Sequence, residues 1–142
     1  MSDESLGKAE ERSADAPPTT RHRKVSYLST AEFCRLNHAC LMVTEGLGCV
    51  PYLVGSATER DDYRDVDIRS ILDDEKWDDL FAGREFFWSL FCLAVSTYLS
   101  EVSGLQVDYQ CQRQTQANEK FKGRRNPIGT KGRLFAGGGD AA

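Results

Sequence analysis

Apolar residues recur along this chain with two periods, and the two periods predict alternating helices and strands. From about residue 30 to residue 47 they recur every three or four positions, which predicts a helix with one apolar face. That face comprises Phe33, Leu36, Cys40, Val43 and Leu47. Ser29 and Glu32 have the spacing of a capping box at the start of this helix, and Gly46 and Gly48 are placed to end it.

Three segments have the pattern of strands. The first is the short apolar run 49–54, with Pro51 near its start, where a missing backbone donor is tolerated. The second and third, 65–72 and 105–112, alternate strictly, so each presents two different faces. In the second strand the faces are Val66, Ile68, Ser70 and Leu72 against Asp65, Asp67, Arg69 and Ile71. In the third they are Leu105, Val107, Tyr109 and Cys111 against the wholly polar set Gln106, Asp108, Gln110 and Gln112.

Three more segments are predicted to be helical, at about 76–81, 84–103 and 114–121. The longest, 84–103, is apolar on more than one side, which predicts that it is the central buried helix and that Gly104 ends it. The pattern as a whole predicts an α/β (α+β) fold. It comprises a small mixed sheet of three or more strands packed against two main helices.

A chain of 142 residues is long enough for one domain and short for two. Residues 1–24 have almost no apolar side chains and include Pro17-Pro18, so we expect a disordered tail there. Residues 131–142 include a run of three glycines, which predicts a flexible end. The folded domain is therefore expected to span residues 25–130.

The net charge of −4 predicts no general affinity for nucleic acid, but the charges are unevenly placed. From Glu59 to Glu85 there are eleven acids against five bases, whereas Arg113 to Arg133 holds seven bases and one acid. An acidic half beside a basic half suits a polyphosphate bound together with a metal ion. The alternative is that both are ordinary solvated faces.

The five cysteines form no Cys-x-x-Cys pair, and neither His22 nor His38 lies at zinc-ligand spacing from a cysteine. We therefore expect reduced, buried thiols in a cytoplasmic protein. No signal peptide is recognised, and we expect no apolar run to be long enough to span a bilayer, so no membrane partner is predicted.

One stretch combines residues with a shared chemistry. Gly55-Ser56 follows the first strand, and Asp65 and Asp67 share one face of the second. Two neighbouring carboxylates repel each other unless a cation lies between them. An oxygen-only pair is typical of Mg²⁺, which takes one or two carboxylates and completes its shell with substrate phosphates.

This arrangement resembles the nucleotidyltransferase superfamily, which includes polymerase beta and the minimal nucleotidyltransferases. The resemblance lies in Gly55-Ser56, Asp65-x-Asp67 and a third carboxylate, Asp108, on a later strand. The ending Arg125-Asn126-Pro127-Ile128-Gly129 is also similar to small nucleotidyltransferase-like proteins of phage and actinobacterial type. One departure is the short gap between Gly-Ser and Asp-x-Asp, which leaves little room for the helix that normally follows.

The resemblance implies transfer of a nucleoside monophosphate from a nucleoside triphosphate to a hydroxyl acceptor. Asp65, Asp67 and Asp108 would hold two Mg²⁺ or Mn²⁺ ions, and Gly55 and Ser56 would hold the β- and γ-phosphates. The acceptor implied is an RNA end such as that of tRNA, a protein side chain, or a small molecule. Nothing in the residues chooses among these.

Three arginines are further candidates for phosphate binding. Arg69 continues the carboxylate face and either pairs with an aspartate or meets a phosphate. Arg124 and Arg125 lie in a basic, turn-rich loop and either clamp a triphosphate or belong to an exposed basic tail.

Two other interpretations remain open. In one, the protein is a catalytically silent nucleotide-binding or protein-interaction module, such as an antitoxin or a phage accessory factor. In the other, Asp65 and Asp67 merely form salt bridges with Arg64 and Arg69 at the edge of the sheet.

Overall fold

The computed structural model describes residues 26–131 of the chain. The expected disordered tail 1–24 and the expected flexible end 131–142 lie outside the described residues, apart from Lys131.

A mixed four-stranded sheet carries the fold, with the strand order β3-β2-β1-β4. Strand β1 is antiparallel to both β2 and β4, whereas β2 and β3 are parallel. The predicted α/β class is confirmed. In chain order the elements are α2 (Thr30–Leu47), β1 (Tyr52–Val54), the 3-10 helix η1 (Gly55–Thr58), β2 (Val66–Leu72), α3 (Asp74–Phe81), α4 (Glu85–Ser103), β3 (Val107–Arg113), α5 (Gln114–Lys120) and β4 (Asn126–Pro127).

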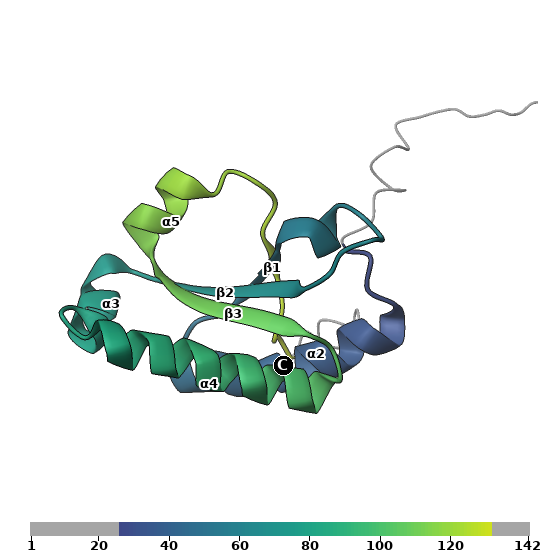
Figure 1. Ribbon diagram of the computed structural model, residues 1–142, viewed down its shortest axis with the longest axis horizontal. Helices are drawn as coiled ribbons and strands as arrows, with labels where there is room; N and C mark the ends of the chain where they lie inside the picture. The colour runs from purple at the N-terminus through teal and green to yellow at the C-terminus, as the bar shows by residue number, and fades with distance from the viewer. Residues whose placement is uncertain (1–25, 132–142) are drawn as a thin grey trace, which may run out of the picture.

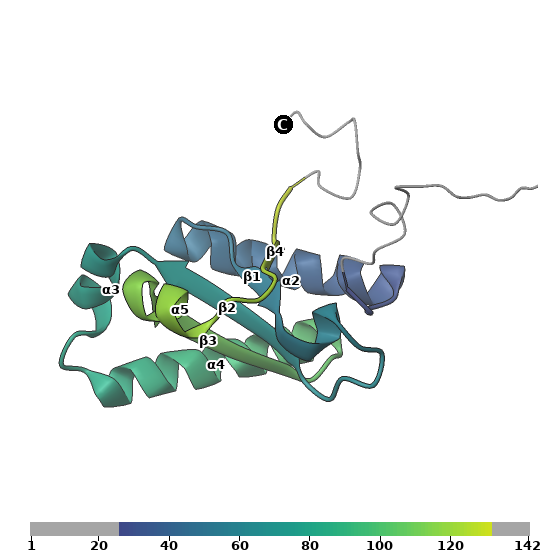
Figure 2. The ribbon, with the colours of Figure 1, turned by 90° about the horizontal axis from the view of Figure 1, so that it is seen from above.

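The two long helices lie on one side of the sheet, and the short helix α5 lies on the other (Figure 1). Seen from above, α2 follows the side of the sheet that carries β1, and α4 follows the side that carries β3 (Figure 2). The core fills the space between the helices and the sheet. Its fully buried members include Leu36 and Cys40 of α2, Leu53 of β1, Ile68 of β2, Leu99 of α4 and Cys111 of β3.

Helix α2 begins and ends as the sequence predicts. The Ser29 hydroxyl accepts a hydrogen bond from the Glu32 amide, and the Glu32 carboxylate accepts one from the Ser29 amide. Gly48 then takes the left-handed conformation, with φ of 77°, and its amide bonds to the Thr44 carbonyl. The first and last turns of the helix therefore have partners for groups that would otherwise be orphaned.

The predicted alternation of β2 is confirmed. Side chains at 66, 68, 70 and 72 are buried, and those at 67, 69 and 71 are half-buried on the other face. The strand begins at Val66, so Asp65 precedes it instead of opening it. The first strand is also shorter than expected, since residues 49–51 come before it.

The basic segment after α5 belongs to the fold and is not an exposed tail. Asn126–Pro127 forms strand β4 beside β1, and Ile128 is fully buried. The side-chain oxygen of Asn37 accepts hydrogen bonds from the amides of Gly129 and Thr130. Pro127 lies on an edge strand, where a missing donor is tolerated. The strand was missed because two residues show no alternation.

All five cysteines are free, as expected. Cys40, Cys92 and Cys111 are buried, and burial raises the pKa of the Cys40 and Cys111 thiols to about 12. Cys34 is exposed and Cys49 is half-buried, so the expectation of buried thiols is wrong at Cys34 and only partly met at Cys49.

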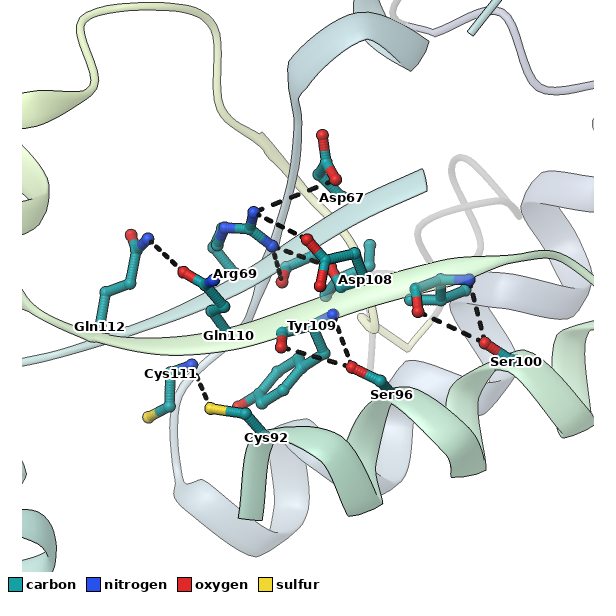
Figure 3. Close-up of polar contacts among 12 residues, drawn as sticks. Asp67, Arg69, Cys92, Ser96, Ser100, Asp108, Tyr109, Gln110, Cys111 and Gln112 are labelled. Atoms are coloured by element: carbon teal, nitrogen blue, oxygen red, sulfur yellow. Dashed lines mark hydrogen bonds and ion pairs between the residues drawn. The ribbon is translucent and has the colours of Figure 1, made fainter. Parts of the chain in front are cut away.

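Helix α4 covers the free edge of strand β3 with hydrogen bonds from its side chains (Figure 3). Ser100 Oγ accepts from the Val107 amide at 2.9 Å, and Ser96 Oγ accepts from the Tyr109 amide at 2.8 Å. Cys92 Sγ lies 3.4 Å from the Cys111 amide, and the Trp88 indole donates to the Cys111 carbonyl at 2.7 Å. We call this set of contacts the edge ladder.

The edge ladder works because two repeats match in length. Four residues of an α-helix rise about 6.0 Å. Two residues of a strand rise about 6.6 Å. Side chains spaced by four on α4 therefore meet backbone groups spaced by two on β3. An unpaired sheet edge invites pairing with other chains, and here a helix occupies that edge.

The long helix is not the central buried helix that its composition predicts. Only Cys92, Leu99 and Ser103 of α4 are buried, while Phe86 is 89 % exposed. By length and composition, Glu85–Ser103 is also the one helix within residues 26–131 that could cross a membrane, contrary to expectation. Because the edge ladder ties its inner side to β3, the structure is compatible with a soluble protein.

The edge ladder predicts that Ser96→Ala and Ser100→Ala each lower the free energy of unfolding by about 1–3 kcal/mol, because each leaves a strand amide without its acceptor. The matched control is Ser89→Ala, at an exposed position on the same helix. It should change stability by less than about 0.5 kcal/mol. Urea denaturation followed by circular dichroism measures all three. Equal stability of Ser96→Ala and Ser89→Ala would show that the ladder contributes nothing.

Candidate functional site

Asp67 and Asp108 face each other across the two parallel strands. They are register partners, Asp67 on β2 and Asp108 on β3, and their side chains lie on the face opposite α2 and α4 (Figure 3). Asp108 is the more open of the two, with half of its side chain exposed. Asp65, just before β2, is half-buried and acts on Asp67 through its charge.

The Gly-Ser turn lies directly against Asp67. Gly55 follows β1 with φ of 81°, a left-handed conformation that favours glycine. A Cβ atom at Gly55 would overlap the Asp67 carboxylate, so no larger residue fits without displacing that side chain. Ser56 lies in η1, whose single turn is closed by the Thr58 hydroxyl donating to the Gly55 carbonyl. The expectation that a full helix has no room there is confirmed.

Arg69 lies between the two carboxylates (Figure 3). One guanidinium nitrogen is 3.4 Å from Asp108 Oδ2 and 4.0 Å from Asp67 Oδ1. The other donates to the Asp108 backbone carbonyl at 2.8 Å. The sequence allowed Arg69 two roles, pairing with an aspartate or binding a phosphate, and in the structure it pairs with aspartate. One of its two pairs, with Asp67, is among those that the salt-bridge interpretation proposed.

The pKa of Asp67 is raised above its ordinary value. Burial is the largest cause, the charges of Asp108 and Asp65 add to it, and Arg69 opposes it. Partial burial and two like charges both disfavour a second negative charge at this point. The site is therefore one where an added cation would be favourable.

A cavity of about 330 Å³ opens beside Gly55, Asp67 and Arg69, whereas Ser56, Asp65 and Asp108 are not among its lining residues. Gly55, Asp67 and Arg69 line one side, and Lys120 and Arg125 bring positive charge to the other. Arg125 is held in place by hydrogen bonds to Asn118 and to the carbonyls of Ala117 and Phe121. The acidic and basic halves of the chain therefore meet at one cavity. Arg124, the other predicted arginine, is half-buried and is not among its lining residues.

A second cavity, of about 420 Å³, adjoins the first, because Gln112, Lys120 and Phe121 line both. Trp77 and Trp88 form its aromatic wall, and both indole N–H groups point at the Cys111 carbonyl. Both tryptophans are partly buried and also pack against the hydrophobic core. A tryptophan on each of two helices flanking a strand is the signal that could have found this cavity.

The carboxylates of Asp67 and Asp108 fit a magnesium ion, since Mg²⁺ is commonly held by two carboxylates together with substrate phosphates. Within residues 26–131, no group of three or more His, Cys, Asp or Glu side chains is arranged to hold a metal ion. The three-carboxylate centre of Asp65, Asp67 and Asp108 therefore stays a prediction, of which the structure brings together two members.

No family model, curated protein or solved structure matches this chain. The resemblance to nucleotidyltransferases therefore stays a prediction from the motif residues.

The contact between Gly55 and Asp67 predicts that Gly55→Ala destabilises the protein more than Gly83→Ala. Gly83 also has a positive φ, of 73°, but nothing lies within 4 Å of the position of its Cβ. Both variants should lose about 1–2 kcal/mol for the left-handed backbone. Only Gly55→Ala must also displace a carboxylate. Urea denaturation compares them, and equal losses would contradict the tight contact.

Proposed function

We propose that this protein binds a nucleoside triphosphate with Mg²⁺ at the Asp67–Asp108 face and transfers its nucleoside monophosphate to a hydroxyl acceptor. The observation that supports this most strongly is the register of Asp67 and Asp108 on adjacent parallel strands. It is strengthened by the glycine turn that abuts Asp67 and by the basic wall across the cavity.

Each residue has a role that follows from its position. Gly55 and Ser56 offer backbone amides and a hydroxyl to phosphate oxygens, and Lys120 and Arg125 neutralise phosphate charge. Asp67 and Asp108 would hold Mg²⁺ or Mn²⁺, which when bound supplies charge neutralisation at the transferred phosphate. Asp108, the more exposed carboxylate, would use its Oδ1 either for this metal ion or to accept the proton of the attacking hydroxyl, since its Oδ2 pairs with Arg69.

The adjoining aromatic cavity suits the base of the nucleotide. Indole and phenyl rings stack on any nucleobase, and Gln110 and Gln112 offer both donors and acceptors to a base edge. A triphosphate in the first cavity and its base in the second would share the wall formed by Gln112, Lys120 and Phe121.

The acceptor is an RNA end such as that of tRNA, a protein, or a small molecule, and the described residues do not distinguish these. Free thiols favour a reducing compartment, so we place the protein in the cytoplasm.

Arg69 supports a second candidate, a catalytically silent module that binds nucleotide or a protein partner. Its guanidinium already pairs with both carboxylates and would compete with a metal ion for them. In this alternative the arginine is a permanent counter-ion, and triphosphate binding, where it occurs, does not depend on Mg²⁺.

The carboxylate pair predicts that Asp67→Asn and Asp108→Asn each reduce the rate of Mg²⁺-dependent nucleotide transfer. The loss should be about 10–100-fold or more, because mutating residues that only orient metal ligands already costs that much. Asp79→Asn is the matched control, because it removes one charge from an exposed position on α3. Pyrophosphate release and transfer of labelled nucleotide to tRNA, protein or the enzyme itself are measured with each nucleoside triphosphate.

The outcomes separate the candidates. Transfer by the unmodified protein and by Asp79→Asn, with loss in both site variants, supports the transferase. Metal-independent binding without turnover supports the silent module. Identical background in all four proteins, with no binding by calorimetry, contradicts both nucleotide proposals.

The second cavity predicts a direct optical signal of binding. The chain has two tryptophans, Trp77 and Trp88, and both line this cavity. Adding a nucleoside triphosphate should therefore quench intrinsic fluorescence, whereas inorganic triphosphate should bind with little quenching. Similar fluorescence spectra with the nucleoside triphosphate and with inorganic triphosphate would show that the base does not bind in the second cavity.

A further inference from the structure

Helix α4 presents a continuous apolar stripe to solvent. Phe86, Leu90 and Leu93 are 89 %, 63 % and 66 % exposed, and Ala94 and Thr97 are exposed beside them. At 3.6 residues per turn, positions 86, 90, 93 and 97 fall on one side of the helix. We call Phe86, Leu90, Leu93 and Thr97, together with the neighbouring Ala94, the α4 stripe. Soluble monomers rarely expose an apolar patch of this kind, so it indicates an interaction surface.

The stripe cannot turn inward, because the opposite side of α4 is already occupied. The edge ladder fixes Trp88, Cys92, Ser96 and Ser100 against β3. Rotating the helix to bury its leucines would strip the strand amides of their acceptors. The exposure of the stripe is therefore set by the same contacts that hold the sheet edge.

We propose that the α4 stripe is the interface of a homodimer, in which the α4 helices of two copies pack antiparallel about a two-fold axis near Leu93. In this arrangement Leu90 of one copy lies across from Thr97 of the other, and Leu93 lies across from Ala94. Phe86 then covers the aliphatic part of Glu101 at the far end of the second copy.

Charge selects the antiparallel arrangement. Glu101 lies near the carboxyl end of α4 and is exposed. Among the described residues Glu101 has no ion-pair partner. Antiparallel packing brings Glu101 of each copy to the amino end of the other α4, where the positive end of the helix dipole attracts it. Parallel packing would place Glu101 against Glu101. Glu85 lies about 100° around the helix from Phe86 and stays outside the stripe.

Other occupants fit the stripe less well. Amphipathic helices that lie on membranes carry many lysines and arginines, whereas α4 has two acids, Glu85 and Glu101, and no base. The remaining chain offers few large apolar side chains to cover it. Outside residues 26–131 these are Met1, Leu6, Val25, Leu134 and Phe135.

The interface is of modest size. A helix of 19 residues is about 28 Å long. Two such helices make an interface at the lower end of the range for stable dimers, about 1,200 Å². We therefore expect a reversible monomer–dimer equilibrium with a dissociation constant in the micromolar range.

The test is sedimentation equilibrium of the full chain over a range of concentrations. Leu90→Glu and Leu93→Glu should each raise the dissociation constant at least about tenfold. Their circular dichroism and urea midpoints should match the unmodified protein, because both positions are exposed. Gln106→Glu is the control, since it adds the same charge at an exposed turn away from the stripe. Two results overturn the proposal. One is an unmodified protein that stays monomeric at millimolar concentration, and the other is a dimer whose dissociation constant changes in neither leucine variant.

Removing one charge tests the orientation. Glu101→Gln should weaken the dimer, because it removes the charge that the amino end of the partner helix attracts. In a parallel dimer the same variant would remove the repulsion between the two Glu101 side chains, so a tighter dimer overturns the antiparallel arrangement. Flotation with phosphatidylcholine–phosphatidylglycerol vesicles is run alongside. A monomer that floats with the vesicles, and loses this ability in Leu93→Glu, would assign the stripe to a membrane surface and also overturn the dimer.

Discussion

The hydrogen bonds from α4 to the free edge of β3 are the constraint on which the rest of the structure depends. They satisfy the strand amides of Val107 and Tyr109 without another strand, because four residues of helix and two of strand have nearly equal rise. Backbone groups of a strand alternate between its two edges, as side chains alternate between its two faces. Fixing the outer edge of β3 therefore also fixes Asp108 on the open face, level with Asp67 on β2.

The same constraint explains why a helix rich in leucine and phenylalanine is mostly exposed. In most surface helices the polar residues face water and the apolar residues face the core. Here two serines and a cysteine are needed inside, since only polar atoms can satisfy a strand edge. Leu90 and Leu93 are left outside, and a partner surface is required to remove them from water.

The candidate site contains its own cation. Arg69 offsets the repulsion between Asp67 and Asp108, so the fold does not need a metal ion to keep the two carboxylates together. Binding a magnesium–triphosphate complex would require Arg69 to release at least one carboxylate, and the phosphates would then be the natural partner for its guanidinium. Whether this exchange occurs is the difference between the transferase and the silent module.

The sequence by itself determined the helices and strands with strong periodicity, the cap at Ser29 and Glu32, and the polar faces carrying Asp67 and Asp108. These follow from local geometry, since the side-chain period and the capping bonds involve neighbours in the chain. Only the tertiary structure decided that Asp65 precedes the strand, that Arg69 lies between the carboxylates, that two residues near Pro127 pair with β1, and that α4 faces outward. Each of these four features depends on hydrogen bonds and ion pairs between residues that are far apart in the sequence. The periodicity of apolar residues carries no information about which distant residues pair.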